Sequence, residues 1–167
     1  RAEVPMAQVV HRPVKVPPSQ RLPRRRGQIF LKRVYDPAEP GDGYRVLVDR
    51  LWPRGLTRDA ARIQAWLRDL APSEGLRTWY GHERDRWAEF RRRYREEFMA
   101  PGNQAALKAL AGRARREAVT LVFAAADPDR NNAVVLKEAL EGILVKRTAG
   151  AEAGPPRGGR GGRAGRS

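Results

Sequence analysis

Asp49 and the residues that follow it are the first group in this sequence whose types could do chemistry. Asp49 and Arg50 close a β-prone apolar run, and Trp52 and Arg54 follow a few positions later. A carboxylate can move a proton, and the planar guanidinium groups of two arginines can hold a phosphate or a carboxylate. The structural alternative is that Asp49 and Arg50 pair with each other or with a neighbour, while Trp52 packs at a turn.

A second polar group follows the most apolar run of the chain. Asp127 comes directly after residues 119–126, and Asn131 and Asn132 stand at the predicted start of a helix, whose free N–H groups carry partial positive charge. Open α/β sheets bind ligands beyond the carboxyl ends of their strands. We therefore expect the two groups to meet in one pocket for a small anion. Asp49 and Asp127 would form a carboxylate pair if their strands are neighbours.

His82 is the third candidate, in the stretch Trp79-Tyr80-Gly81-His82 between two predicted helices. The pKa of an unperturbed histidine is about 6.5, so His82 could act as an acid or a base near neutral pH. The structural alternative is that His82 caps the following helix or fills a polar position in the core.

Metal and cofactor signatures are absent from the sequence. The chain has no cysteine and two histidines, and its carboxylates lack the spacing of metal ligands. It contains no Walker loop, no GxGxxG after a strand and no GxSxG motif. The sequence therefore predicts neither a metal nor a cofactor.

The spacing of apolar residues predicts the elements that must position these groups. Continuous apolar or β-branched runs are typical of buried strands, and apolar residues three and four positions apart are typical of helices. Because helical patterns separate the strands, we expect an α/β domain with a small parallel or mixed sheet covered on both faces, which an unrecognised short strand or a dimer contact could extend. Strands are predicted over Ile29–Val34, Tyr44–Arg50 and Val119–Ala124.

Helices are predicted between and after these strands. The clearest one places four aromatic residues on one face, and opposite charges four positions apart support its solvent face. Those residues are Trp87, Phe90, Tyr94 and Phe98, with the pairs Arg92/Glu96 and Arg93/Glu97. The other predicted helices are one capped by Thr57 and ended by Pro72, with Ile63, Trp66, Leu67 and Leu70 as its stripe, a short one capped by Ser73, one capped by Asn103, and one from about Asn131 to Glu141.

Most of the formal net charge of +15 lies outside the predicted domain. Residues 1–26 hold seven basic and one acidic residue, residues 146–167 hold six and one, and residues 27–145 hold 21 and 17. The Pro-, Gly- and Arg-rich composition of the two ends predicts disordered tails on either side of a single domain over residues 27–145. The run from Arg157 to Arg163 is similar to RGG segments that bind RNA weakly, although a solvated extension is the simpler interpretation.

Five stretches, in this order along the chain, resemble one bacterial family. The resemblance is to the YeaO-like branch of the family catalogued as domain of unknown function 488, and it covers about residues 29–142. It implies a compact Rossmann-like α/β domain in the bacterial cytoplasm, and it implies no established reaction or catalytic residue. The stretches are Asp49–Gly55, Asp69–Ser73, Trp79–His82, Phe90 with Arg93-Tyr94, and Asn131–Leu136.

The chain departs from the family pattern at three positions. Glu83 stands where the family usually has Asp, Ala126 where a basic residue is common, and Arg130 where many members have His. The last two changes weaken any mechanism that needs a His or Lys there. They leave a passive anion site open.

The leading hypothesis is a small-ligand enzyme or binding domain for an anionic, nucleotide-like molecule. Two alternatives stay open: a nucleic-acid-associated protein that binds non-specifically through its basic tails, and a structural or interaction module without a ligand. No apolar run reaches membrane-helix length and the N-terminus lacks the apolar stretch of a secretory signal, which predicts a cytoplasmic protein with no membrane partner. The oligomeric state stays open. The ligand-binding candidates are Arg50, Arg54, Trp52, Asn131 and Asn132, and the proton-moving candidates are His82, Asp127 and Asp49.

Overall fold

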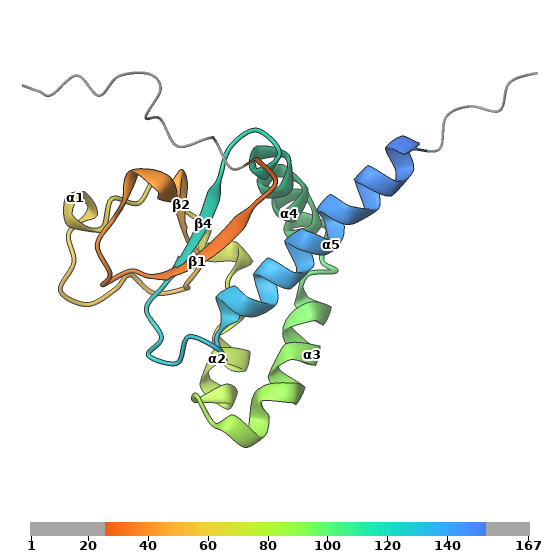
Figure 1. The fold of residues 1–167 in the computed structure, drawn as a ribbon. Coiled ribbons are helices and arrows are strands. Elements are labelled where there is room, and N and C mark those ends of the chain that lie inside the picture. The colour runs from red at the N-terminus through yellow and green to blue at the C-terminus, as the bar shows by residue number, and fades with distance from the viewer. Residues whose placement is uncertain (1–25, 153–167) are drawn as a thin grey trace, which may run out of the picture.

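The computed structural model describes residues 26–152, and a parallel sheet of four strands lies at the centre (Figure 1). The strands lie in the order β1-β4-β2-β3, so the last strand in the chain separates the first two. This sheet confirms the predicted α/β class, and β3 is a short strand that the apolar pattern did not reveal. The bounds are Ile29–Arg33 (β1), Tyr44–Leu47 (β2), Ala65–Trp66 (β3) and Val119–Phe123 (β4).

β4 is an inner strand and every one of its residues is buried, as its run of β-branched and apolar side chains suits. Val119 lies opposite Ile29 of β1 on one side and opposite Tyr44 of β2 on the other. Gly43 leads into β2 with a φ of 63°, and a Cβ atom there would lie 2.3 Å from the carbonyl oxygen of Ala118. Both the backbone conformation and the close approach therefore require glycine where the chain enters β2.

Helices α2 to α5 lie on one side of the sheet (Figure 1). α5 packs against β1 and β4 as well as against α3 and α4. The predicted aromatic stripe is confirmed, because Phe90, Tyr94 and Phe98 are buried in this layer and successive rings lie 5.7 and 4.4 Å apart. The bounds are Glu74–Tyr80 (α2), Trp87–Glu97 (α3), Pro101–Ala114 (α4) and Asn132–Glu152 (α5).

The opposite face of the sheet has a thinner cover. Ala61 of α1 (Arg58–Ala61) and Val122 of β4 belong to a second buried cluster, against which Trp52 and Leu56 pack. Both faces are covered, as the sequence predicts, but the second face is covered by the short helix α1 and the loop residues around it.

The helix predicted between Thr57 and Pro72 is wrong beyond α1. The Thr57 hydroxyl accepts the N–H of Ala60 at 3.1 Å, as expected, but Arg62 adopts a left-handed φ of 49° and ends the helix. The chain then runs beside β2 as β3, and a short 3-10 helix η3 (Arg68–Leu70) follows. Of the apolar residues that suggested one helical stripe, Ile63 follows α1, Trp66 lies in β3 and Leu70 lies in η3.

The ends of α4 and α5 also differ from the prediction. α4 begins at Pro101, and the side-chain amide of Asn103 donates to the carbonyl of Glu97 at 2.7 Å instead of capping the helix. α5 begins where predicted and continues to Glu152, beyond residue 145. Of the tails predicted over residues 1–26 and 146–167, residues 1–25 and 153–167 lie outside the described part of the chain, and residues 146–152 belong to α5. None of the helices within residues 26–152 has the length and apolar character that a bilayer crossing requires.

One of the two ion pairs predicted on α3 forms. Arg92 pairs with Glu96 four positions later, as expected. Arg93 instead pairs with Glu89 at 2.9 Å, and Glu97 accepts hydrogen bonds from the segment before α2. The carboxylate of Glu97 thus ties α3 to the cap of α2.

Candidate functional site

Asp49 follows β2 at the carboxyl edge of the sheet, and its carboxylate is bonded to two neighbouring elements. Oδ2 accepts the backbone N–H of Ala124, just after β4, at 2.8 Å, and Oδ1 accepts the side-chain amide of Asn132, at the start of α5, at 3.1 Å. Burial raises the pKa of Asp49, while the two donors and the charge of His82 act in the opposite direction. Asp49 therefore fastens β2 to β4 and α5, and both of its oxygens are engaged.

Arg50 is half-buried beside Asp49, and the protein uses few of its donors. Its Nε donates to the carbonyl of Pro72 at 2.8 Å. Among the described residues, no Asp or Glu oxygen lies within 4.0 Å of the guanidinium, so the ion pair considered for Asp49 and Arg50 is not formed. The two terminal nitrogens have no hydrogen-bond partner in the described chain, and neither is buried. They are accessible to water or to a ligand.

The two asparagines hold the backbone in place. Asn131 is 1% exposed; its Oδ1 accepts the N–H of Val134 at 3.2 Å and its Nδ2 donates to the carbonyl of Asp127 at 2.9 Å. The amide of Asn132 also donates to the carbonyl of Val48 at 2.8 Å. One of the helix N–H groups predicted to be free is therefore occupied by Asn131 itself.

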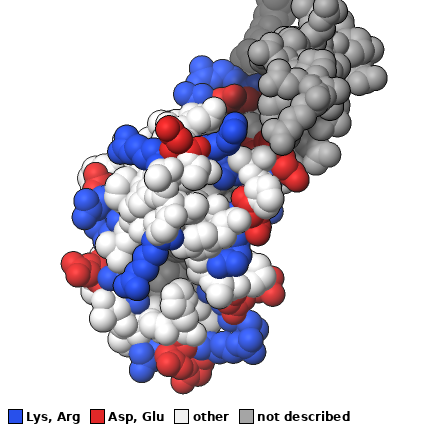
Figure 2. Space-filling model, turned by 90° about the vertical axis from the view of Figure 1, so that its left-hand side faces the viewer, with Lys and Arg blue, Asp and Glu red and all other residues white. Residues whose placement is uncertain are grey.

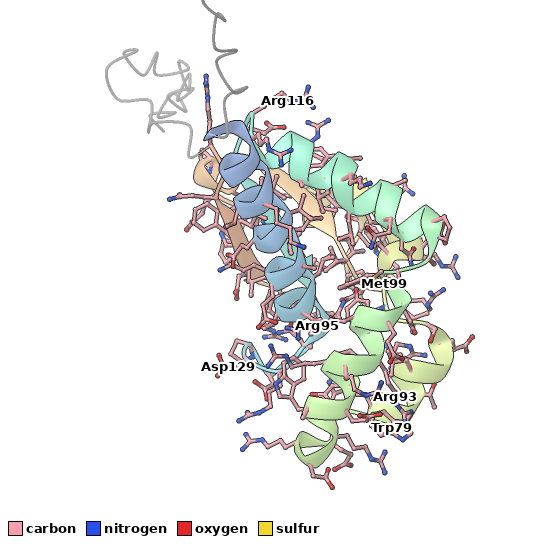
Figure 3. All side chains as sticks on the ribbon, turned by 90° about the vertical axis from the view of Figure 1, so that its right-hand side faces the viewer. Trp79, Arg93, Arg95, Met99, Arg116 and Asp129 are labelled. Carbon is pink, nitrogen blue, oxygen red and sulfur yellow. The ribbon has the colours of Figure 1, made fainter. Side chains whose placement is uncertain are left out.

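Asp127 lies in the loop between β4 and α5 and is bonded within that loop. It accepts the N–H of Asp129 at 3.0 Å and lies 3.3 Å from a guanidinium nitrogen of Arg130. The N–H of Asp129 and the charge and hydrogen bond of Arg130 lower the pKa of Asp127. Figure 3 shows Asp129 on this loop, next to the amino end of α5. Asp49 and Asp127 both lie at the carboxyl edge, as predicted, but each is engaged with its own donors.

His82 lies in the turn after α2, where it adopts a left-handed φ of 59° and is exposed. Its ring centre lies 5.7 Å from that of Tyr80, whose hydroxyl donates to the carbonyl of Arg130 at 3.0 Å. Because Tyr80 reaches Arg130, the turn that carries His82 lies beside the loop that follows β4. Its exposure excludes the polar core position considered from the sequence. No hydrogen bond fixes the imidazole within residues 26–152.

Trp52 and Arg54 lie in the loop that crosses to the thinner side of the sheet. The indole N–H of Trp52 donates to the carbonyl of Leu56 at 2.6 Å, and its ring meets Trp66 edge-on at 5.4 Å. Trp52 therefore packs at a turn, which is the structural alternative to the ligand-binding role considered from the sequence. Arg54 is exposed, and its carbonyl accepts the hydroxyl of Tyr35 at 3.2 Å. No described contact joins the Arg54 side chain to Arg50.

Two further residues shape this edge and were not singled out from the sequence. Arg33 ends β1 and donates from Nε to the carbonyl of Ala125 at 2.9 Å, so it binds the chain as it leaves β4. The buried hydroxyl of Tyr94 donates to the carbonyl of Leu70 at 2.7 Å, and burial raises its pKa. The sequence holds no signal for the first role, because the predicted strand continues past Arg33 to Val34. The role of Tyr94 could not be recognised, because its place in the aromatic stripe predicts only packing in the core.

The carboxyl edge thus gathers Asp49, Arg50, His82 and the Asp127 loop, but it does not pair any two of them for proton transfer. Within the described chain, no three His, Asp or Glu side chains lie together in a way that would hold a metal ion. The groups that remain accessible, the Arg50 guanidinium and the His82 imidazole, are suited to an anion.

The fold and this edge define a small α/β domain with a parallel sheet, in which most of the polar edge residues hold strands and helix together. A family model described as the inactive DUF488-N3 subclade matches residues 28–157, and the chain belongs to this subclade. This confirms the resemblance to the YeaO-like proteins of that family.

The curated relatives carry no functional description. An uncharacterized protein of Mycobacterium tuberculosis strain H37Rv is 42% identical over 118 residues, which cover 71% of this chain and 98% of that protein. The uncharacterized protein YeaO of Escherichia coli K12 is 41% identical over 115 residues, which cover 69% and 98%. No solved structure matches the chain.

Proposed function

We propose that this domain binds a small anionic molecule at the carboxyl edge of its sheet without transforming it. The observation that carries the proposal is Arg50, a half-buried arginine that is held through Nε and keeps both terminal nitrogens unpartnered within the described chain. A guanidinium held in this way offers a planar fork to a phosphate or a carboxylate. His82, on the same edge, adds a donor and, when protonated, a second positive charge. A nucleotide-like phosphate ester is the ligand that the proposal favours.

The engagement of the carboxylates supports binding rather than catalysis. Asp49 accepts a hydrogen bond on each oxygen, and Asp127 is bonded to Asp129 and Arg130. A general base needs access to the proton that it removes, and a catalytic histidine is usually oriented by a second group. His82 has no such group among the described residues. The name of the subclade, which calls it inactive, agrees with this interpretation.

Calorimetric titration of the full chain with adenosine monophosphate and with inorganic phosphate tests the proposal. Arg50→Gln should weaken binding by about tenfold or more, because a charge-assisted hydrogen bond contributes about 1.5–3 kcal/mol. Arg116→Gln is the matched control, since Arg116 is exposed and lies at the opposite end of the molecule from Trp79 and the α2–α3 turn (Figure 3). Arg54→Gln tests whether the second predicted arginine takes part.

Two results would contradict the proposal. Equal affinities in the wild type and in Arg50→Gln, with circular dichroism showing both folded, would make Arg50 structural. If the wild-type protein releases a product from the nucleotide and His82→Gln abolishes that release, the domain is an enzyme. Because Arg50 also holds the Pro72 carbonyl, the melting temperature of each variant must be measured beside its affinity.

The charge distribution gives a second candidate function, non-specific binding of nucleic acid by the tails. On the face that Figure 2 shows, Lys and Arg are interspersed with Asp and Glu. The ends of the sequence, in contrast, are strongly basic. Changing Arg157, Arg160 and Arg163 to Ser in the full chain should weaken binding of single-stranded RNA and reduce its salt dependence. Unchanged binding would remove this candidate.

A further inference from the structure

A pocket of about 510 Å³ opens at the other end of the sheet from Asp49. Gly43 and Gln64 line it, and each stands directly before a strand, Gly43 before β2 and Gln64 before β3. Since the strands are parallel, this is the amino edge of the sheet. The volume falls within the range of about 300–1,000 Å³ that small-molecule sites occupy.

Arg45 forms the floor of this pocket and is held by an extensive network. Its side chain is 6% exposed and lies 2.6 Å from a carboxylate oxygen of Asp42, which Lys32 also contacts at 2.9 Å. The other guanidinium nitrogens of Arg45 donate to the carbonyls of Ala61 at 3.0 Å and Arg62 at 3.2 Å. The floor is thus a rigid cationic group whose position is fixed from several directions.

Arg58, at the start of α1, and Arg62, its cap, also line the pocket. The guanidinium of Arg58 lies 6.0 Å from the centre of the Trp52 ring, a contact that leaves its charge without a carboxylate. Within residues 26–152, neither arginine has a carboxylate oxygen within 4.0 Å. Two acidic residues also line the pocket, Glu39, which lies 3.3 Å from Lys32, and Asp59. The residues that line the pocket therefore include three arginines and two acidic residues, and two of those arginines lack an ion-pair partner in the described chain.

The backbone of Arg62 is strained in a way that serves this arrangement. Arg62 has a φ of 49°, a conformation that glycine and asparagine adopt far more readily than arginine does. The turn directs the carbonyls of Ala61 and Arg62 onto Arg45, and Arg62 is one of the residues that line the pocket. A glycine would form the same turn without strain, so the turn alone does not explain an arginine here. Strained residues cluster at ligand sites.

We infer that this amino-edge pocket is a second binding site, for a small polar molecule that carries a phosphate or carboxylate group. Arg58 and Arg62 contact the anionic group above the fixed guanidinium of Arg45. Glu39 and Asp59 accept hydrogen bonds from hydroxyl or amino groups elsewhere on the ligand. The site is separate from the carboxyl edge and does not depend on the function proposed for Arg50.

Nuclear magnetic resonance titration of the full chain with pyrophosphate, and separately with citrate, tests the inference residue by residue. Either probe should shift the amide signals of Gly43, Arg62 and Gln64 and saturate with a Kd below about 1 mM. Arg58→Gln and Arg62→Asn should each weaken this binding by about tenfold or more. Arg62→Asn keeps a residue that accepts the left-handed turn, so loss of binding there does not reflect loss of the fold. Arg77→Gln, an exposed arginine on α2, is the control and should bind as the wild type does.

Different readouts separate this site from the one around Arg50. Shifts at Gly81 and His82 that vanish in Arg50→Gln report the carboxyl edge, whereas shifts at Gly43 and Gln64 that persist in that variant report the amino-edge pocket. The inference is overturned if up to about 10 mM of both probes leaves the signals of Gly43 and Gln64 in place, or if Arg58→Gln and Arg62→Asn both bind with wild-type affinity. Shifts confined to the terminal segments would overturn it as well.

Discussion

Replacement of Asp49 by alanine should destabilise this protein more than removal of any exposed carboxylate. The side chain joins the ends of β2 and β4 and the start of α5 through hydrogen bonds of 2.8 Å to Ala124 and 3.1 Å to Asn132. Without it, the N–H of Ala124 loses its partner. The amide of Asn132 is affected less, because it keeps its bond of 2.8 Å to the Val48 carbonyl.

The magnitude follows from these two bonds. A buried donor left without a partner costs about 1–3 kcal/mol, and the partly compensated Asn132 bond contributes about 1 kcal/mol. The variant also escapes the unfavourable burial of a carboxylate, which is the effect that raises the pKa of Asp49. We therefore expect Asp49→Ala to lower the free energy of unfolding by about 2–3 kcal/mol.

Urea denaturation at neutral pH, followed by far-ultraviolet circular dichroism, measures this change. Asp59→Ala is the matched control: Asp59 is exposed and has no ion pair within residues 26–152, so the effect should stay within about 0.5 kcal/mol. Asp49→Asn should fall between the two, since its amide keeps one acceptor and presents a donor where an acceptor is needed. If Asp49→Ala proved no more harmful than Asp59→Ala, the fastening role would be refuted, and the carboxylate would be better explained as a ligand group.

Three other predictions concern the fold and its charges. Gly43→Ala should lower the free energy of unfolding by at least about 3 kcal/mol, because the added Cβ would collide with the Ala118 carbonyl at a position of positive φ. Gly41 has open space around it, so Gly41→Ala should change the free energy of unfolding by less than about 1 kcal/mol in the same urea experiment. Asn131→Ala should cost about 1–3 kcal/mol through loss of the α5 cap and of a buried hydrogen bond, and a cost under about 0.5 kcal/mol would contradict the capping role. Hydrogen bonds from Arg92 and Arg93 lower the pKa of Glu89 from 4.5 to about 2, so the carboxyl carbon signal of Glu89 should titrate with a midpoint near pH 2. In Arg92→Gln this midpoint should rise. A wild-type midpoint near 4.5 would show that these contacts do not persist in solution.

The sequence could predict those elements whose pattern is continuous. β4 and the aromatic stripe of α3 are buried as expected, because an uninterrupted apolar run and a three-and-four spacing leave little choice of partner. The segment after Thr57 was misread because its apolar spacing suits one helix, while the left-handed turn at Arg62 has no local signature. Its pairing as β3 depends on hydrogen bonds to β2, which is distant in the sequence and cannot be inferred from the segment itself.

The candidate site was predictable in its position but not in its use. The rule that places ligands at carboxyl strand ends correctly brings Asp49 and Asp127 to one edge. It cannot tell whether a carboxylate faces solvent or accepts hydrogen bonds from the protein, because the donors come from Ala124 and Asn132, which are far away in the chain. The amino-edge pocket was missed for a related reason. Its floor depends on the hydrogen bonds of Arg45 to the carbonyls of Ala61 and Arg62, which come 16 and 17 positions later, and its lining depends on the turn that replaced the predicted helix.

The position of β4 between β1 and β2 has a consequence for how the protein is made. Asp49 and Ala124, which meet across this part of the sheet, are 75 positions apart. During synthesis β1 and β2 leave the ribosome early, yet neither can find its inner neighbour until β4 has emerged. The sheet therefore closes only after β4 has emerged, and the long sequence separation of its paired strands favours slow folding.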